Sequence, residues 1–239
     1  MDVRSLIDEK IDPELIEWLT KKETAVNALN AIEELFVGLK QTLNLGIVDE
    51  FVSITGPVHI GAGSHIHPHV TIEGPVIIGE NVSVRSGAQI RNHAYIGSDC
   101  VIGHGADIKR SLCLNGAKMQ DGTFVGDSVI GAGARVGSGA ILANRKFNQS
   151  EVSIKTQDGI LLPTGRKFLG ALMGRFSRLG ANVVLSPGTV IGEYTWVASG
   201  LVVSGTHGPD LLITAKQELD IRPKSRVDLS SGREDYEHI

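Results

Sequence analysis

The chain has 239 residues, is 41% hydrophobic and carries a formal net charge of −4 at pH 7. This length allows one large domain or two small ones, and the slightly acidic charge argues against a surface dominated by nucleic-acid or anionic-membrane contacts. No apolar run approaches the roughly 18 residues that cross a bilayer, the N-terminus lacks a signal-peptide core, and Cys100 and Cys113 are too few for a disulfide framework. We therefore expect a cytoplasmic protein with no nucleic-acid partner and no membrane insertion.

Residues 1–45 predict a short N-terminal helical segment. Asp12 followed by Pro13 is typical of a helix start, because Asp caps the first free N–H groups and Pro fits the first helical position. A second start is indicated by Thr20–Glu23, which has the spacing of a capping box. Apolar residues then recur at helical spacing, which predicts a second amphipathic helix: Ala25, Leu29, Ile32, Phe36 and Leu39.

From residue 54 the apolar period becomes six. It runs without a miss through Ile54, Ile60, Ile66, Ile72, Ile78, Val84, Ile90, Ile96, Ile102, Ile108 and Leu114. A longer repeat of 18 residues separates "GPVHIG" (56–61) from "GPVIIG" (74–79). A chain that turns a corner every six residues gives coils of three short strands, each with one aliphatic residue pointing inward. Residues 46–205 are therefore predicted to form a parallel β-helix.

The rhythm is interrupted twice before the chain ends. It breaks near 118–131, and it stops at 144–167, where "VSIKTQDGILL" indicates a hairpin turning at Asp158-Gly159. We expect this second segment to leave the helix body as a loop that reaches a neighbouring copy, although a simple insertion is the alternative. Residues 206–239 are predicted to be a polar tail. Because an aliphatic core has no internal pocket, binding sites of such a protein lie in clefts between copies, and we expect a homotrimer.

Several phrases in the coils resemble a known family. "ENVSVRSGAQIRNHAYIG", "GDSVIG", "TGRKFLGALMG" and "GANVVLSPGTVIG" are similar to the C-terminal domain of sugar-1-phosphate nucleotidylyltransferases, including the bifunctional enzyme that makes UDP-N-acetylglucosamine and its archaeal relatives. The resemblance implies a mainly β fold, the left-handed parallel β-helix of hexapeptide repeats. It also implies a trimer that acetylates an amino-sugar phosphate with acetyl-CoA as co-substrate. No Gly-rich phosphate loop of the nucleotidyltransferase domain occurs, so we expect no nucleotidyltransferase activity.

The resemblance implies a phosphate-binding pair at Arg91 and Lys109. They are 18 residues apart, so one coil separates them and they share a face. Two cations at this spacing suit a phosphate or diphosphate through charge-assisted hydrogen bonds, and two solvated surface cations are the alternative. The resemblance also places Asn144 and Arg135 near acyl-CoA.

Other positions depart from the family pattern. The catalytic histidine of the family corresponds to Asp121, its tyrosine to Phe124, an asparagine to Arg135 and a lysine to Ser150. A histidine accepts the proton of the attacking amine, and a carboxylate is a weaker base than imidazole near neutral pH. Asp121 is therefore predicted to act as the base, to orient an amine or to pair with Arg135.

Four further histidines require interpretation. His93 and His104 lie near Arg91 and Lys109 in the predicted stack, so either is a candidate displaced base or a surface residue at a corner. His65 and His67 flank inward Ile66, which indicates a metal pair, a solvated face or a trimer contact. We expect no metal.

Two functions follow from these patterns. The first is an acyltransferase that uses acetyl-CoA on a sugar phosphate or nucleotide sugar, with Asp121, His104 or His93 handling the proton. The second is a trimer that binds nucleotide sugars without catalysis and assists a separate nucleotidylyltransferase through its N-terminal helices.

Overall fold

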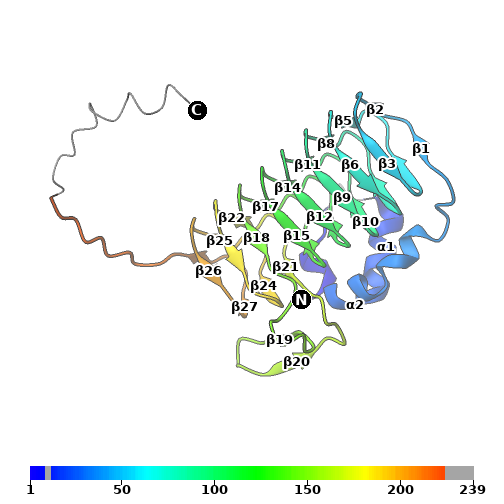
Figure 1. Cartoon of the computed structure of the whole chain (residues 1–239). Coiled ribbons are helices and arrows are strands. Elements are labelled where there is room, and N and C mark those ends of the chain that lie inside the picture. The colour runs from blue at the N-terminus through cyan, green and yellow to red at the C-terminus, as the bar shows by residue number, and fades with distance from the viewer. Residues whose placement is uncertain (9–11, 224–239) are drawn as a thin grey trace, which may run out of the picture.

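The computed structural model describes residues 1–8 and 12–223, so residues 224–239 of the predicted tail lie outside it. Within the described part of the chain, no helix is long and apolar enough to cross a membrane. The fold is mainly β, as predicted: a left-handed parallel β-helix in which successive strands pass to three sheets in turn (Figure 1).

The three sheets are named I, II and III in the order in which each coil meets them. In the described residues, sheet I has nine strands: β1 (Leu43–Asn44), β4 (Val58–Ile60), β7 (Val76–Ile78), β10 (Ala94–Ile96), β13 (Leu112–Cys113), β16 (Val129–Ile130), β21 (Ala171–Met173), β24 (Thr189–Ile191) and β27 (Thr206–His207). Sheet II also has nine there: β2 (Ile47–Val48), β5 (His65–Ile66), β8 (Ser83–Val84), β11 (Val101–Ile102), β14 (Lys118–Met119), β17 (Arg135–Val136), β22 (Arg178–Leu179), β25 (Trp196–Val197) and β28 (Leu212–Ile213). Sheet III has eight in the same part of the chain: β3 (Ser53–Thr55), β6 (Thr71–Glu73), β9 (Gln89–Arg91), β12 (Asp107–Lys109), β15 (Phe124–Gly126), β18 (Ile141–Leu142), β23 (Val184–Leu185) and β26 (Val202–Val203).

The core is a stack of inward aliphatic side chains to which all three sheets contribute. In sheet III, for example, Ile72, Ile90 and Ile108 are register partners and fully buried. Their neighbours along each strand point outward, because successive strand residues face opposite sides. The six-residue period therefore determines which side chains fill the core and which face outward, where they can contact ligands or other chains.

The six-residue period breaks at two corners, one inside the predicted stretch 118–131, between Val125 and Ile130, and one a coil earlier that the sequence pattern does not predict. Ile96, Cys113 and Ile130 are register partners, so Cys113 and not Leu114 takes the inward position. Leu114 is buried in a second cluster outside the coils. These two coils are 17 residues long because each lacks one residue at the corner between sheets III and I. The corner after Ile108 and the corner after Val125 are thus shortened by one residue each.

The N-terminal segment contains η1 (Val3–Ser5), α1 (Pro13–Lys22), α2 (Ala25–Asn30) and η2 (Ile32–Phe36). The predicted start of α1 is confirmed, since the Asp12 carboxylate accepts the Glu14 N–H at 2.7 Å. The predicted capping box at Thr20 is wrong: Thr20 Oγ1 donates to the Ile16 carbonyl, and Thr24 caps α2 through the Asn27 N–H. The second helix is also shorter than predicted, because α2 ends at Asn30 and continues as a 3₁₀ turn.

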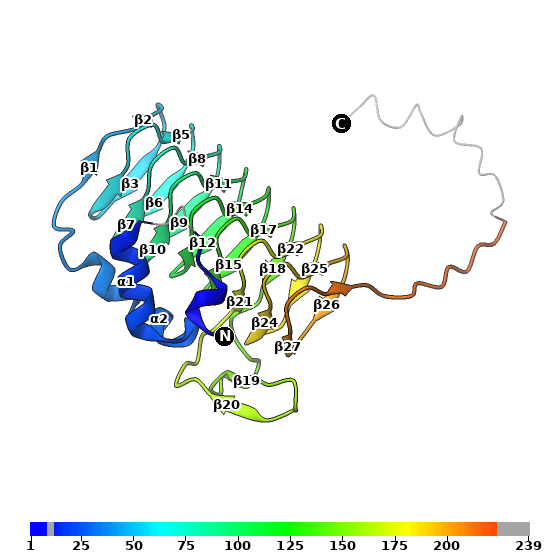
Figure 2. The ribbon, with the colours of Figure 1, turned by 180° about the vertical axis from the view of Figure 1, so that it is seen from behind.

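This segment covers the outward side of sheet I (Figure 2). Leu19 and Leu29 are almost fully buried, and they share one cluster with sheet I residues that point away from the coil core, including Leu112, Val129 and Leu172. Burying each such leucine contributes about 1.5–3 kcal/mol. The N-terminal segment leaves sheets II and III uncovered.

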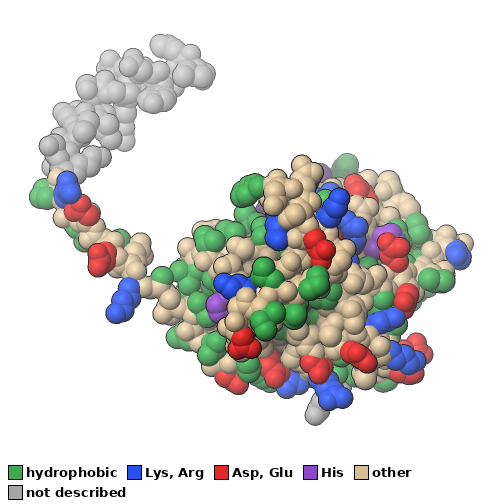
Figure 3. All heavy atoms as spheres, turned by 90° about the horizontal axis from the view of Figure 1, so that it is seen from below, with side chains coloured by type: hydrophobic (Ala, Val, Ile, Leu, Met, Phe, Trp, Pro, Cys, Tyr) green, Lys and Arg blue, Asp and Glu red, His purple; other side chains and the backbone are tan. Residues whose placement is uncertain are grey.

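The predicted hairpin is confirmed. Strands β19 (Ser153–Lys155) and β20 (Leu161–Pro163) pair antiparallel around a turn at Asp158-Gly159, and Gly159 has a φ of +84° that favours glycine. The hairpin projects from the coils at the lower side of Figure 1. Viewed from that side, hydrophobic side chains lie exposed among charged ones (Figure 3), and Leu161 at the hairpin tip is 63% exposed.

Candidate active site

The outward face of sheet III carries the predicted phosphate-binding pair. Arg91 and Lys109 are register partners on β9 and β12, so they lie side by side one coil apart, as their spacing predicts. Arg91 forms a fork-like pair with Asp107, with Nε to Oδ1 at 3.1 Å and Nη2 to Oδ2 at 2.8 Å. This hydrogen bonding raises the pKa of Arg91. The Arg91 charge is therefore held in place and partly neutralised before any ligand arrives.

Lys109 has a different environment. Its Nζ lies 5.4 Å from the centroid of the Phe168 ring, and the Arg145 guanidinium lies 5.5 Å from the same ring. Within the described residues, no carboxylate lies in salt-bridge range of Lys109. Lys109 is consequently the cation of the pair that remains available for an anion. Phe168 was missed as a site residue, although it lies inside the "TGRKFLG" phrase.

Asp127 forms a buried ionic hub at the shortened corner. Its side chain is fully buried, and Oδ1 lies 2.9 Å from Arg110 Nε and 3.3 Å from Arg166 Nη2. Asn144 Nδ2 donates to Oδ2 at 2.8 Å. One carboxylate therefore joins the coil corner to the long loop. Asp127 was also missed by sequence reasoning, although the "GDSVIG" phrase contains it.

Arg166 extends this hub to the N-terminal segment. Its Nη1 donates to the Leu29 carbonyl at 3.2 Å and to Asn30 Oδ1 at 3.0 Å. Burial lowers the pKa of Arg166, and the charge of Asp127 opposes that shift. Arg166 therefore satisfies one of the carbonyls left free where α2 ends.

His104 and Asp121 meet at the corner between sheets II and III, one coil apart. The Asp121 Oδ1 accepts the backbone N–H of His104 at 2.9 Å, and the His104 Nδ1 lies 2.6 Å from the Ser86 carbonyl oxygen. A carbonyl can only accept, so Nδ1 donates and the neutral ring keeps its lone pair on Nε2. The structure thus assigns to His104 the tautomer of a base whose accepting nitrogen is not used by this contact.

His93 lies apart from this corner. It follows β9 at the corner between sheets III and I, and its ring packs edge-on against Phe36 with centroids 5.3 Å apart. The structure therefore brings His104 together with Asp121 but places His93 against the N-terminal segment.

Arg135 lies on sheet II, away from Asn144. It is the register partner of Lys118 and of Arg178, so three cations line one outward row. Arg135, Arg178 and Trp196 border a cavity of about 480 Å³, and the Arg178 guanidinium lies 5.3 Å from the Trp196 ring centroid. Within one chain the two residues predicted to contact acyl-CoA are on different faces. Three side chains whose spacing could hold a metal ion lie elsewhere, in the first two coils: Asp49, His65 and His67.

The comparisons with known proteins match parts of the chain. The family model of the GMPPB C-terminal domain matches residues 72–162. The bifunctional sugar-1-phosphate nucleotidylyltransferase/acetyltransferase of Sulfurisphaera tokodaii is 37% identical over 100 residues, which are 42% of this chain and 25% of the relative. The bifunctional protein GlmU of Methanococcus maripaludis is 36% identical over 179 residues, or 75% of this chain and 43% of the relative. The chain spans less than half the length of these relatives.

Solved structures also align with the coils. The UDP-N-acetylglucosamine O-acyltransferase of Moraxella catarrhalis is 17% identical, with a TM-score of 0.34 over 70% of this chain and 68% of that one. An N-acyltransferase of Bacillus cereus, solved with dTDP and coenzyme A, is 14% identical, with a TM-score of 0.33 over 87% and 96%. By its sequence matches, the chain resembles the C-terminal domain of the sugar-1-phosphate nucleotidylyltransferases, as its phrases predict.

Proposed function

We propose that this protein is an acyl-CoA-dependent acyltransferase that modifies the amino group of a sugar phosphate or nucleotide sugar. The observation that carries the proposal is that Lys109 on sheet III, which has no carboxylate partner among the described residues, is in the same coil as His104, whose imidazole has an available nitrogen at the adjoining corner. Lys109 and His104 are five residues apart in one coil, and the chain turns a corner between them, so their Cα atoms are separated by less than the about 16 Å of an extended chain. A hexosamine phosphate, together with the reach of both side chains, fits this span.

The chemistry follows from these positions. Lys109, with Arg91 beside it, holds the phosphate of the acceptor. The His104 Nε2 takes a proton from the amine while the amine nitrogen attacks the thioester carbonyl. The new C–N bond forms as the C–S bond breaks, and the proton then passes to the departing sulfur of coenzyme A. Asp121 fixes the backbone of His104 and acts as a positioning residue.

The cavity at Arg135 and Arg178 suits the other substrate. Two guanidinium groups match phosphate groups, and the exposed Trp196 indole offers a surface for stacking a nucleotide base. Acetyl-CoA carries both chemical groups. Because this cavity is on sheet II and the acceptor groups are on sheet III, the proposed complete site needs sheet II of one copy beside sheet III of another. A homotrimer of prisms provides that arrangement.

A second function has its own supporting observation. Arg91 is already paired with Asp107, and the position of the family histidine holds Asp121. Both are compatible with a trimer that binds nucleotide sugars and has lost catalysis. Docking of a separate nucleotidylyltransferase through the apolar face of the N-terminal helices is less compatible, because that face packs on the chain's own sheet I.

One experiment separates these functions. The protein is incubated with acetyl-CoA and glucosamine 1-phosphate, and released thiol is followed over time. The proposal expects thiol release that depends on both substrates, and a raised KM for the sugar phosphate in Lys109→Ala. If no thiol is released while calorimetry still detects sugar-phosphate or coenzyme A binding, the protein is a binding protein.

A further inference from the structure

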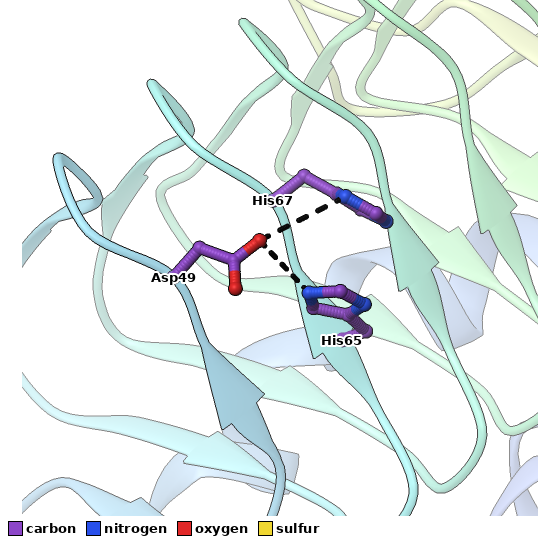
Figure 4. Close-up of side chains that lie close together, drawn as sticks. All are labelled: Asp49, His65 and His67. Carbon is purple, nitrogen blue, oxygen red and sulfur yellow. Dashed lines mark hydrogen bonds and ion pairs between the residues drawn. The ribbon is translucent and has the colours of Figure 1, made fainter.

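Two histidines and one carboxylate converge on the outward side of sheet II in the first two coils (Figure 4). His65 and His67 flank the inward residue Ile66 on β5, so their rings share the outward side. Asp49 follows β2, and the pairing of Val48 with Ile66 places Asp49 beside His67. The three side chains therefore come from two successive coils.

The distances in this cluster are close to those of a metal site. His65 Nε2 lies 2.8 Å from Asp49 Oδ2, and His67 Nδ1 lies 3.9 Å from the same oxygen. One donor atom from each residue lies within 4.8 Å of the others. A tetrahedral zinc ion with bonds of about 2.0–2.2 Å places its ligand atoms about 3.3–3.5 Å apart. Changes of about 0.4–0.7 Å would bring the two imidazole nitrogens to that distance from the Asp49 oxygen.

The donor set also favours a transition metal such as zinc over an alkaline-earth ion. Imidazole nitrogen and carboxylate oxygen together suit Zn²⁺, whereas Mg²⁺ and Ca²⁺ prefer oxygen ligands alone. The three side chains are each partly exposed, so water can complete the coordination. An ion pair between Asp49 and His65 would not require a second histidine. The His67 ring nevertheless stacks on the His65 ring, with centroids 4.0 Å apart, so a third potential ligand lies beside the pair.

We propose that Asp49, His65 and His67 bind a zinc ion that fastens the first coil to the second. The first coil is the end of the stack, since β1, β2 and β3 each have a neighbour on one side only. It also exposes large apolar side chains, with Phe51 at 74% and Ile47 at 61%. Terminal repeats of a solenoid have lower stability unless they are capped. A metal that joins Asp49 to the next coil holds this end closed. The site does not include the residues proposed for acyl transfer, so either proposal can fail alone.

The test uses the full chain, freed of metal with a chelator and then titrated with zinc chloride by calorimetry. Co²⁺ serves as a second probe, because its visible absorption reports tetrahedral coordination. We expect one zinc ion per chain and a higher melting temperature, since a ligand bound only by the folded state stabilises it. His65→Gln, His67→Gln and Asp49→Asn should each weaken zinc binding at least about tenfold, because loss of even outer-shell partners costs about 10–100-fold.

His59→Gln is the matched control, because His59 is also an outward strand histidine and is outside the cluster. It should bind zinc as the wild type does, and circular dichroism checks that every variant folds. Hydrogen exchange should show that zinc slows exchange in residues 43–55 of the wild type. Zinc affinity that is unchanged in all three variants, or no saturable binding to the wild type, would refute the site. Binding without added protection of residues 43–55 would refute the fastening role.

Discussion

His104 and His93 are both near the phosphate-binding pair in the sequence, and their surroundings give them different chemistry. The Nδ1 of His104 is occupied by the Ser86 carbonyl, which leaves Nε2 to accept a proton. We predict that His104→Gln lowers kcat by about 10²–10⁴, the usual contribution of a general base. His93→Gln should leave kcat unchanged, because His93 packs against Phe36.

Asp121→Asn discriminates the positioning role from a catalytic one. The amide oxygen of asparagine can still accept the His104 N–H, so we expect a smaller loss than in His104→Gln. Steady-state kinetics of the three variants with acetyl-CoA and glucosamine 1-phosphate make the comparison. A fully active His104→Gln beside an inactive Asp121→Asn would show that the carboxylate is the base.

The two cysteine thiols should be unreactive toward thiol reagents in the native protein. Burial raises the pKa of the Cys100 thiol to about 12 and that of Cys113 well above its usual range, and both side chains are fully buried. Only the thiolate reacts, so the reactive fraction of Cys100 near pH 8 is about 10⁻⁴. We predict no rapid reaction with a disulfide reagent before unfolding and two thiols per chain after it. Rapid labelling of the folded chain would contradict this burial. Because the protein's own thiols do not react with the reagent, the thiol detected in the acyl-transfer assay comes from coenzyme A.

At the scale of elements, Asp127 holds three parts of the fold together. It pairs with Arg110 on the coil corner and with Arg166 on the loop, and Arg166 reaches α2. Removing one partner of a buried pair costs about 3–5 kcal/mol, because the opposite charges are left buried without compensation. We predict that Asp127→Asn lowers the free energy of unfolding by about 3 kcal/mol, at the low end of that range, since Arg110 is 35% exposed.

Asp107→Asn is the control for this prediction. Asp107 and Arg91 form a pair of similar geometry, but both side chains are more than a quarter exposed. Loss of an exposed pair costs about 0–1 kcal/mol. Urea unfolding of both variants gives the comparison, and equal losses would show that the Asp127 hub is not special.

Glu34 links α1 to η2 and makes that contact sensitive to acid. Hydrogen bonds from Lys22 and from the Trp18 indole lower the pKa of the Glu34 carboxyl below 4.5. A carboxyl whose pKa is lower in the folded state stabilises the fold above its unfolded pKa. This stabilisation is lost as the pH falls through the folded pKa.

We therefore predict that Glu34→Gln weakens the N-terminal segment at neutral pH but not at a pH well below 4.5. Urea unfolding followed by Trp18 fluorescence, in a Trp196→Phe background, measures the local stability. The neighbouring substitution Glu33→Gln should have no comparable effect. A difference between wild type and Glu34→Gln that persists in acid would exclude the ionised carboxylate as its source.

The sequence predicts the strands of the coils, but it does not predict the structure of several corners between them. A period of six cannot be satisfied by an isolated helix or sheet, so it predicts the coils and their inward residues. The shortened corner after Ile108 was missed because Cys113 and Leu114 are both apolar, and only the pairing of Cys113 with Ile96 and Ile130 separates them. The sequence does contain a signal for the strand that precedes Asp49. Val48 lies six residues before Ile54, so it extends the six-residue period by one strand, and Asp49 follows it directly. The Asp127 hub joins residues far apart in the chain, which no local pattern predicts.

For the whole molecule, the three faces have different roles. Sheet I is covered by the N-terminal segment, while sheets II and III are open. The outward row of sheet III changes along the stack. Its early coils present Ser53, Thr71, Gln89 and Asp107, and its later coils present Phe124, Ile141, Val184 and Val202. A row of exposed apolar side chains on an ordered sheet is typical of a contact with another chain. The polar half is then left for ligands.

This division predicts how the proposed trimer can be broken. Val202 is 75% exposed at the apolar end of sheet III, and a lysine there would bury a charge if that end is an interface. We predict that Val202→Lys is monomeric by analytical ultracentrifugation at concentrations where the wild type is trimeric. Ser53→Lys, an outward substitution at the polar end of the same sheet, should stay trimeric. Because the proposed site needs Arg135 from a second copy, Val202→Lys should also lose acyl transfer while keeping its fold. A wild type that is monomeric, or a monomeric Val202→Lys with full activity, would place the whole site within one chain.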